Sequence, residues 1–230
     1  MIRIRIENVV ASATLSPALD LPKIALALPG AEYDPNQFPG LIYRLDAPRT
    51  AVLLFSSGKA VCTGGRSRGQ IDETFRFVTR LMQRAGQKML ARPKIQIQNI
   101  VATSSLGTEV NLNSIAVTLG LDRVEYEPEQ FPGLVCRLDD PRVVVLIFGS
   151  GKLVCTGARR PADLYRAVEK ITLELRGADL LPRDRAPVPV AAPHRAPPAR
   201  STLGSSIAAP TPLAPSPSPL VPSEVAALSE

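Results

Sequence analysis

The sequence predicts an α+β fold built from two similar halves, and the main observation behind this prediction is an internal repeat. Residues 38–66 and 131–159 are identical at 20 of 29 aligned positions, at an offset of 93 residues. The earlier segment 6–11 (IENVVA) returns as residues 97–102 (IQNIVA), at an offset of 91 residues. A repeat with only two copies favours a pseudo-twofold domain with a shared core, since a solenoid needs at least three. We therefore expect one domain over residues 1–181, with repeat units 1–90 and 91–181.

Hydrophobic periodicity predicts the same order of elements in each unit: strand, short helix, four strands, longer helix. Turns rich in Pro and Gly separate the short strands. The expected elements of the first unit are a strand over 2–11, a helix over 17–28, strands near 32 and over 41–45, 50–55 and 59–63, and a helix through Ile71, Phe75, Val78, Met82 and Ala85. The second unit repeats this order and ends on a helix through Leu164, Val168, Ile171 and Leu175. An antiparallel sheet with helices on one face is the arrangement that this order favours.

The last 49 residues differ in composition from the rest of the chain. Residues 182–230 hold 12 of the 23 prolines, together with many Ala and Ser. Such a segment has few large apolar groups to offset chain entropy, so we expect a disordered tail. A Pro-rich ligand for a groove-binding partner is the alternative interpretation.

Charge and reactive residues narrow the class of function. The net charge of +6 favours an anionic partner, although only weakly. The single histidine, His194, lies in the tail, so the domain has no His-based triad or His-rich metal site. Cys62, Cys136 and Cys155 form no CxxC pair, and we expect them to be buried as small hydrophobic residues. Residues 56–59 (SSGK) lack the spacing of a phosphate-binding loop. We expect no enzyme activity, no metal and no cofactor, and neither a transmembrane helix nor a signal peptide.

The strand pattern also predicts an apolar binding face. Side chains of a strand alternate between the two faces of a sheet, and here both faces are apolar enough to be buried. Helices can cover only one of them. The second face should carry Asn8, Val10, Leu53, Phe55, Val61 and Thr63, with basic residues at its rim. An apolar surface of that size usually marks a binding site, and duplex DNA is the leading ligand with matching pseudo-twofold symmetry.

Several segments resemble the TATA-box-binding protein family. They are QNIVAT, YEPEQFPGLVCRL, LIFGSGKLVCTGAR and their first-repeat counterparts, and the resemblance covers residues 1–181. It implies a saddle: a curved ten-stranded antiparallel sheet whose concave face sits on the DNA minor groove, with four helices on the convex face. The long low-complexity leader of many eukaryotic members is missing, so the chain is similar to archaeal members. That similarity implies a cytoplasmic, nucleoid-associated protein, or a nuclear one if the source is eukaryotic.

The resemblance implies a set of DNA-binding residues in each repeat. The family's wedge phenylalanines correspond to Phe38, Phe55, Phe131 and Phe148; without the resemblance, Phe55 and Phe148 could equally be core residues. Central hydrogen-bonding residues correspond to Asn8, Thr63, Asn99 and Thr156. The apolar floor of the face corresponds to Val10, Leu53, Val61, Val101, Leu146 and Val154. A phosphate-binding rim corresponds to Arg44, Lys59, Arg137 and Lys152.

The resemblance also implies partners. Glu127 and Glu129 match the loop where the family docks transcription factor B, through which RNA polymerase is recruited; a solvated loop is the alternative interpretation. A homodimer through the apolar face is a further expectation for the free protein. The basic side of the helix with Arg76, Arg80 and Arg84 could touch flanking DNA or a regulator, or simply be solvated. A competing function is another saddle-fold nucleic-acid-binding module not dedicated to promoters, which would be expected to lack the four phenylalanines.

Overall fold

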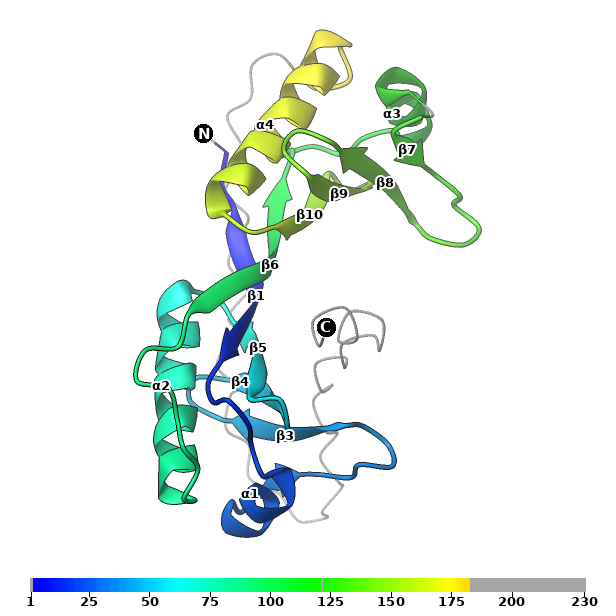
Figure 1. Ribbon diagram of the computed structural model, residues 1–230. Coiled ribbons are helices and arrows are strands. Elements are labelled where there is room, and N and C mark those ends of the chain that lie inside the picture. The colour runs from blue at the N-terminus through cyan, green and yellow to red at the C-terminus, as the bar shows by residue number, and fades with distance from the viewer. Residues whose placement is uncertain (1, 121, 183–230) are drawn as a thin grey trace, which may run out of the picture. The chain divides into compact units, whose positions relative to one another are not determined.

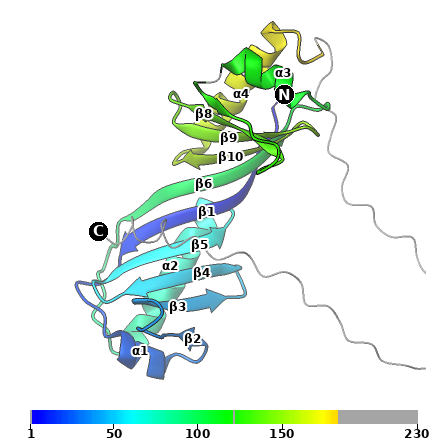
Figure 2. The same cartoon turned by 90° about the vertical axis from the view of Figure 1, so that its right-hand side faces the viewer.

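A single ten-stranded sheet dominates the computed structural model, which describes residues 2–120 and 122–182. Every neighbouring pair of strands is antiparallel, in the order β2-β3-β4-β5-β1-β6-β10-β9-β8-β7. Figure 2 shows most of this order as successive curved strands. The strands are β1 (Arg5–Thr14), β2 (Ala31–Glu32), β3 (Gly40–Leu45), β4 (Thr50–Phe55), β5 (Lys59–Gly65), β6 (Ile95–Ser105), β7 (Val124–Glu125), β8 (Gly133–Leu138), β9 (Val143–Phe148) and β10 (Lys152–Ala158).

Helices of both repeats pack through one core onto the same face of the sheet (Figure 1). They are α1 (Leu21–Ala27), α2 (Arg68–Arg84), α3 (Leu112–Leu119) and α4 (Pro161–Gly177). The long α2 contacts β5 and β1, and α4 contacts β10, β9 and β6. The short α1 lies against β2 and β3, and α3 lies against β7 and β8. The predicted α+β class, the ten-stranded curved sheet and the four helices on one face are confirmed.

Local sequence explains where three of these helices begin. The side chains of Asp20, Ser67 and Asn111 each accept a hydrogen bond from a backbone N–H in the first turn, which satisfies a donor that the helix leaves unpaired. Proline occupies the first turn of α1 and of α4, where its fixed φ suits a helix and its missing N–H costs nothing. The predicted apolar face of α2 is buried, with Ile71 and Val78 fully inaccessible.

The two repeats join through their first strands. β1 and β6 pair antiparallel from Arg5↔Thr103 to Ala13↔Ile95. The register of this pair shifts twice, so that Glu7 and Gln98 are extra residues in β-bulges. Because bulges increase the local twist of a strand pair, they suit the centre of a curved sheet.

Strand and helix ends differ from the predictions by a few residues. The first strand runs from Arg5 to Thr14 instead of 2–11, because its ends are set by its partners in β6 and β5. The first helix is limited to Leu21–Ala27, since Asp20 caps it and Leu28 is extended. Cys62, Cys136 and Cys155 are buried and free, as predicted. No helix within the described ranges has the length and apolar character needed to cross a membrane. Of the predicted tail, residues 183–230 lie outside the described residues.

Candidate nucleic-acid interface

The sheet face opposite the helices, called the open face below, carries the predicted floor residues. Val52, Leu54 and Cys62 belong to the helix-covered core, whereas their strand neighbours Leu53 and Val61 lie outside it. Leu53 pairs with Val61 across β4 and β5, and Leu146 pairs with Val154 across β9 and β10. In the first repeat the floor is buried, and in the second it is half-buried. The floor residues are Val10, Leu53, Val61, Val101, Leu146 and Val154.

Two Asn–Thr pairs lie at matched positions of the open face. Asn8 Nδ2 lies 3.3 Å from the hydroxyl oxygen of Thr63, and Asn99 Nδ2 lies 3.1 Å from that of Thr156. All four side chains are half-buried among apolar neighbours. Each Asn side chain also accepts a hydrogen bond from a backbone amide, Gly64 in one repeat and Gly157 in the other, at 2.8 Å in both. The structure therefore brings together the four polar residues that the sequence places in separate strands.

The four phenylalanines form two matched aromatic pairs, one in each repeat. The ring centroids of Phe38 and Phe55 are 5.9 Å apart with an interplanar angle of 67°. Those of Phe131 and Phe148 are also 5.9 Å apart, with an angle of 65°. Edge-to-face contacts of this kind are the favoured geometry for aromatic rings. Phe131 keeps 37% of its surface exposed, which is unusual for a residue of this size and fits a surface role better than a core role.

The loops before β3 and β8, residues 33–39 and 126–132, are called the stirrup loops. In the first, the backbone N–H of Phe38 donates to the carbonyl of Asp34, whose carboxylate accepts from Asn36 N and Gln37 Nε2. In the second, Phe131 N donates to the carbonyl of Glu127, whose carboxylate accepts from Gln130 Nε2.

These contacts fix the bend that presents each leading phenylalanine, and they occupy the Glu127 carboxylate within its own loop. Glu129 is exposed. Within residues 2–120 and 122–182 its carboxylate makes no hydrogen bond or ion pair.

The predicted rim is basic, but its arginines are paired with carboxylates. Arg44 Nε lies 3.4 Å from Glu32, and Arg137 lies 3.1 Å from Glu125 at its nearest atoms. Both pairs are well exposed, so each contributes little to stability and can exchange partners in water. Lys152 is exposed and Lys59 is half-buried. An incoming polyanion would therefore compete with Glu32 and Glu125 for the arginines.

Sequence reasoning missed the residues beside the two asparagines. Thr103 Oγ1 donates to Glu7 at 3.0 Å, and Arg5 Nε lies 3.1 Å from the same carboxylate. In the second repeat, Gln98 Nε2 donates to the hydroxyl of Ser12 at 2.7 Å. The centre of the open face is thus charged in one repeat and neutral in the other. In the repeat alignment Glu7 is equivalent to Gln98, and each directly precedes a matched asparagine. This difference beside two identical residues is the sequence signal that could have identified them.

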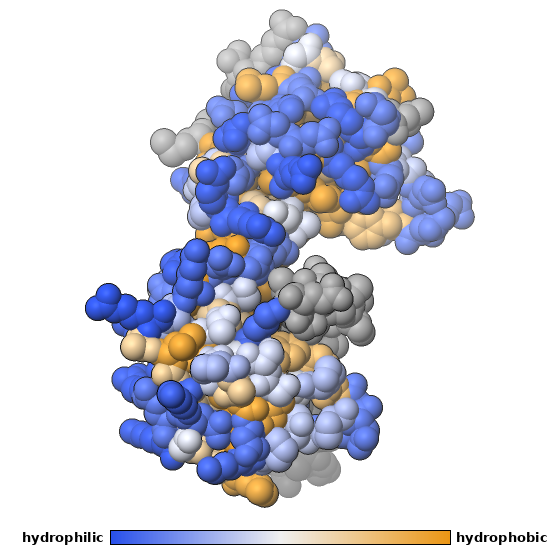
Figure 3. Space-filling view, in the orientation of Figure 1, coloured by the Kyte–Doolittle hydropathy of each residue, from blue (hydrophilic) through white to orange (hydrophobic). Residues whose placement is uncertain are grey.

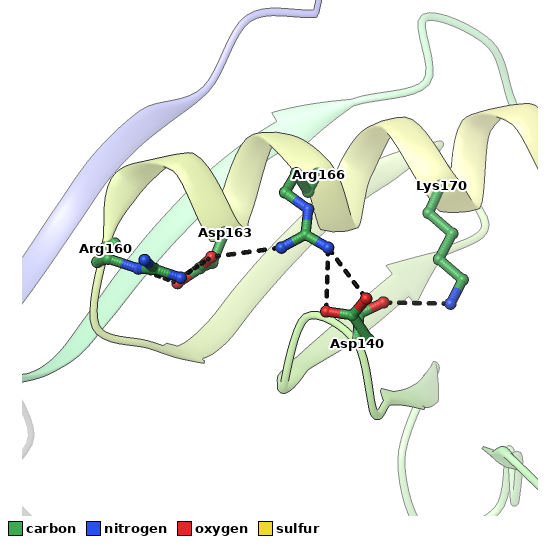
Figure 4. A network of polar contacts seen from close by, with 5 residues as sticks. All are labelled: Asp140, Arg160, Asp163, Arg166 and Lys170. Carbon is green, nitrogen blue, oxygen red and sulfur yellow. Dashed lines mark hydrogen bonds and ion pairs between the residues drawn. The ribbon is translucent and has the colours of Figure 1, made fainter.

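The helix-covered side has a different character. In Figure 3 hydrophilic residues dominate the surface over α4, and hydrophobic residues border the inner edge of the second repeat. On α4, Arg166 bridges Asp163 and Asp140, and Lys170 Nζ donates to the carbonyl of Asp140 (Figure 4). This network ties α4 to the turn between β8 and β9. Arg76, Arg80 and Arg84 of α2 are exposed as predicted.

The three buried cysteines are held in their unreactive, protonated form. Burial raises the pKa of Cys62 and Cys155 to about 12 and that of Cys136 to about 11. The thiols therefore stay protonated at neutral pH, and thiols are poor nucleophiles in that form. Within residues 2–120 and 122–182 no group of His, Cys, Asp and Glu is arranged to hold a metal ion. What the open face offers is apolar contact, a few fixed polar groups and a basic rim.

Comparison with known proteins assigns this architecture to a family. The family model described as "Transcription factor TFIID (or TATA-binding protein, TBP)" matches residues 3–85 and 94–178, one match for each repeat. TATA-box-binding protein E of Halobacterium salinarum is 53% identical over 178 residues, covering 77% of this chain and 96% of that protein.

The TATA-box-binding protein of Thermoplasma acidophilum is 52% identical over 179 residues, covering 78% and 97%. The solved structure of Methanococcus jannaschii TBP superposes with a TM-score of 0.72 at 47% identity, covering 76% of this chain and 99% of that one. The chain therefore belongs to the TATA-box-binding protein family.

Proposed function

We propose that this protein binds the minor groove of T/A-rich promoter DNA, kinks it by phenylalanine insertion, and acts as a general transcription initiation factor. The observation that carries the proposal is the repetition of one constellation on the open face. Each repeat supplies a Phe pair with ring centroids 5.9 Å apart and an Asn–Thr pair between the Phe pairs. A pseudo-twofold surface of this kind matches the near-twofold backbone of a short duplex.

The phenylalanines act as wedges in this proposal. Each pair enters a base step at one end of the site and unstacks it, which costs a few kcal/mol per step, a magnitude known from the DNA-kinking proteins of this same family. The bent duplex then covers more of the apolar floor, which offsets the cost. Flexible steps such as TA are the easiest to deform. Selection for T/A-rich sites thus arises partly from deformability, without any base contact.

The centre of the face provides the second source of selectivity. The minor groove of an A·T pair presents only acceptors, N3 and O2, whereas a G·C pair adds the guanine amino group. Asn and Thr side chains can donate to those acceptors. The surrounding valines and leucines leave an amino group without a partner, and an unpaired buried donor is costly. Arg44, Lys59, Arg137 and Lys152 supply phosphate contacts that make affinity depend on salt.

The second stirrup loop and the open face also suggest protein partners. Glu127 and Glu129 are exposed acidic residues of the second stirrup loop, and together they offer a contact for a basic partner surface. We assign this contact to transcription factor B, which would then recruit RNA polymerase. Off DNA, a second copy could cover the same apolar face as a homodimer. A DNA-binding role places the protein at the nucleoid.

A band-shift experiment tests the proposal with wild type and Phe148→Ala on a T/A-rich duplex and a G·C-rich duplex across a salt series. Wild type should prefer the T/A-rich duplex and bend it. Phe148→Ala should lose bending and at least about tenfold in affinity, or ~1.4 kcal/mol. Phe77→Ala is the matched control, because Phe77 is 39% exposed on α2, on the other side of the sheet. Equal affinity of wild type for the two duplexes would refute the proposal.

A further inference from the structure

The backbone amides of Gly64 and Gly157 lie at the centre of the open face, where each meets an asparagine side chain. Gly64 N donates to Asn8 Oδ1 at 2.8 Å, and Gly157 N donates to Asn99 Oδ1 at 2.8 Å. The two contacts are repeat equivalents with the same length. Neither glycine is paired with a residue of the neighbouring strand, so its amide can bond to a side chain without breaking a hydrogen bond between the strands.

A bulge in the last strand of each repeat frees these amides. Between the pairs Val9↔Gly65 and Ala11↔Cys62, the two residues Thr63 and Gly64 face the single residue Val10. The same count recurs in the second repeat, between Cys155↔Ala102 and Ala158↔Ile100. An extra residue in a bulge is left unpaired in the ladder. The amide can therefore turn toward the neighbouring strand and reach the asparagine.

Glycine is required at both bulges by backbone conformation. The φ angles are +92° at Gly64 and +94° at Gly157, a region that residues with a Cβ rarely adopt. At Gly64 an added Cβ would also lie 2.9 Å from the carbonyl oxygen of Arg49. A Cβ added at Gly157 would lie no closer than 3.7 Å to any atom, so at this position only the positive φ angle requires glycine.

The glycine amide determines which way the asparagine amide is turned. A backbone N–H can only donate, so the atom that faces it must be the side-chain oxygen and not the nitrogen. The Thr63 hydroxyl lies 3.3 Å from both the nitrogen and the oxygen of the Asn8 side chain, and the Thr156 hydroxyl lies 3.1 Å from the nitrogen and 3.4 Å from the oxygen of Asn99. A threonine hydroxyl that donates to the asparagine oxygen holds the side-chain amide in the same orientation as the glycine N–H does, and one that accepts from the nitrogen directs its own proton outward. Each asparagine likewise keeps a second N–H for a ligand.

We propose that Gly64 and Gly157 are positioning residues whose backbone amides hold the side-chain oxygens of Asn8 and Asn99, so that both asparagines present N–H groups to the ligand and exclude the guanine amino group. The inference rests on the proposed function and names the residues that set its selectivity. Without the glycine N–H, each asparagine amide can rotate and offer its oxygen instead. That oxygen would accept a hydrogen bond from the amino group, and the distinction between A·T and G·C at the central pairs would be lost.

Replacement of one atom tests this directly. Glycolic acid in place of Gly157 converts the peptide N–H to an ester oxygen and leaves the side chains and φ preference unchanged. The probes are duplexes that carry either adenine or 2,6-diaminopurine opposite thymine at one central pair, since diaminopurine adds only the minor-groove amino group. Wild type should bind the adenine duplex about 5- to 150-fold more tightly, the range for one mismatched pair. The ester variant should lose most of that ratio while its affinity for the adenine duplex changes less.

Two controls keep the outcomes distinct. An ester at Gly69, in the first turn of α2, tests for a general effect of the linkage and should leave the ratio unchanged. Amide hydrogen exchange at Gly157 should be at least about tenfold faster in Asn99→Ala than in wild type, because the acceptor is gone; this readout needs no ester.

An ester variant that keeps the wild-type ratio, or an exchange rate unaffected by Asn99→Ala, would overturn the positioning role alone. A wild-type protein that shows no preference for T/A-rich DNA would instead overturn the proposed function.

Discussion

Gly40 and Gly133 decide whether each phenylalanine pair can form. A Cβ on Gly133 would lie 2.7 Å from Phe131 Cε1 and 3.0 Å from Phe148 Cε1. At Gly40 the corresponding distances are 2.6 Å to Phe38 and 3.2 Å to Phe55. Neither glycine has a positive φ, so what the site requires there is space and not backbone freedom. The glycine of each FPG segment thus leaves the space in which its phenylalanine pair forms.

Gly133→Ala should therefore damage DNA bending more than folding. The added methyl group displaces the ring of Phe131, a partly exposed side chain that can move at low cost, so the free energy of unfolding should change by less than about 1 kcal/mol. Affinity for a T/A-rich duplex should fall at least about tenfold, with reduced bending by fluorescence energy transfer between labelled duplex ends. Gly149→Ala is the control, since its Cβ would meet nothing closer than 3.9 Å. Unchanged bending by Gly133→Ala would contradict this account of the pair.

At the scale of elements, the two long helices begin in different ways. Ser67 caps α2, because its hydroxyl oxygen accepts from Gln70 N at 3.2 Å. The equivalent position of α4 is Arg160, whose side chain makes no cap hydrogen bond. There the first turn is held by Pro161 and by the ion pair between Arg160 and Asp163. The repeats have therefore kept the helix and changed the local interaction that starts it.

Ser67→Ala should lower the free energy of unfolding by about 1 kcal/mol, as expected for loss of a helix N-cap. Urea denaturation followed by circular dichroism measures the change. Because α2 lies on the far side of the sheet from the open face, affinity for a T/A-rich duplex under native conditions should stay within about twofold of wild type. Ser57→Ala, at an exposed turn residue, is the control and should change stability by less than about 0.5 kcal/mol. A stability equal to wild type would mean that the cap contributes nothing.

At the scale of the whole described domain, the two repeats present nearly the same surface to a ligand. The Phe pairs have the same centroid distance and the Asn contacts the same length in both repeats. The repeats also differ, since the apolar floor is buried in the first and half-buried in the second, and several residues are exchanged. Among them are Asn36 against Glu129 in the stirrup loops and Glu7 against Gln98 at the centre. A protein of this symmetry has little basis for distinguishing the two directions along a promoter.

We therefore expect weak polarity on DNA without a partner. A cleavage reagent tethered to one stirrup loop should cut both ends of a TATA element with less than about threefold preference, under 1 kcal/mol. Adding transcription factor B should make the pattern one-sided, and Glu129→Asn should abolish that effect. Asn36→Glu should give the partner a second acidic site and weaken its directing effect. Strong polarity of the protein alone would contradict this expectation.

The sequence alone determined the repeat, the fold class, the order of elements and the face of those strand residues that lie away from the bulges. These follow from local periodicity and from the identity of segments 93 residues apart. It also placed the phenylalanines, asparagines and threonines at equivalent positions. The ends of elements were less predictable, as the first strand shows, because the length of a strand depends on the partners it finds.

The tertiary structure decided what depends on contacts between segments distant in the chain. Only the pairing of β1 with β6 joins the repeats into one sheet, and only the bulges bring the amides of Gly64 and Gly157 to Asn8 and Asn99. The carboxylates beside Arg44 and Arg137 likewise come from neighbouring strands, Glu32 from β2 and Glu125 from β7. Hydrogen-bond direction and register are properties of paired backbones, and a single strand read in isolation does not contain them.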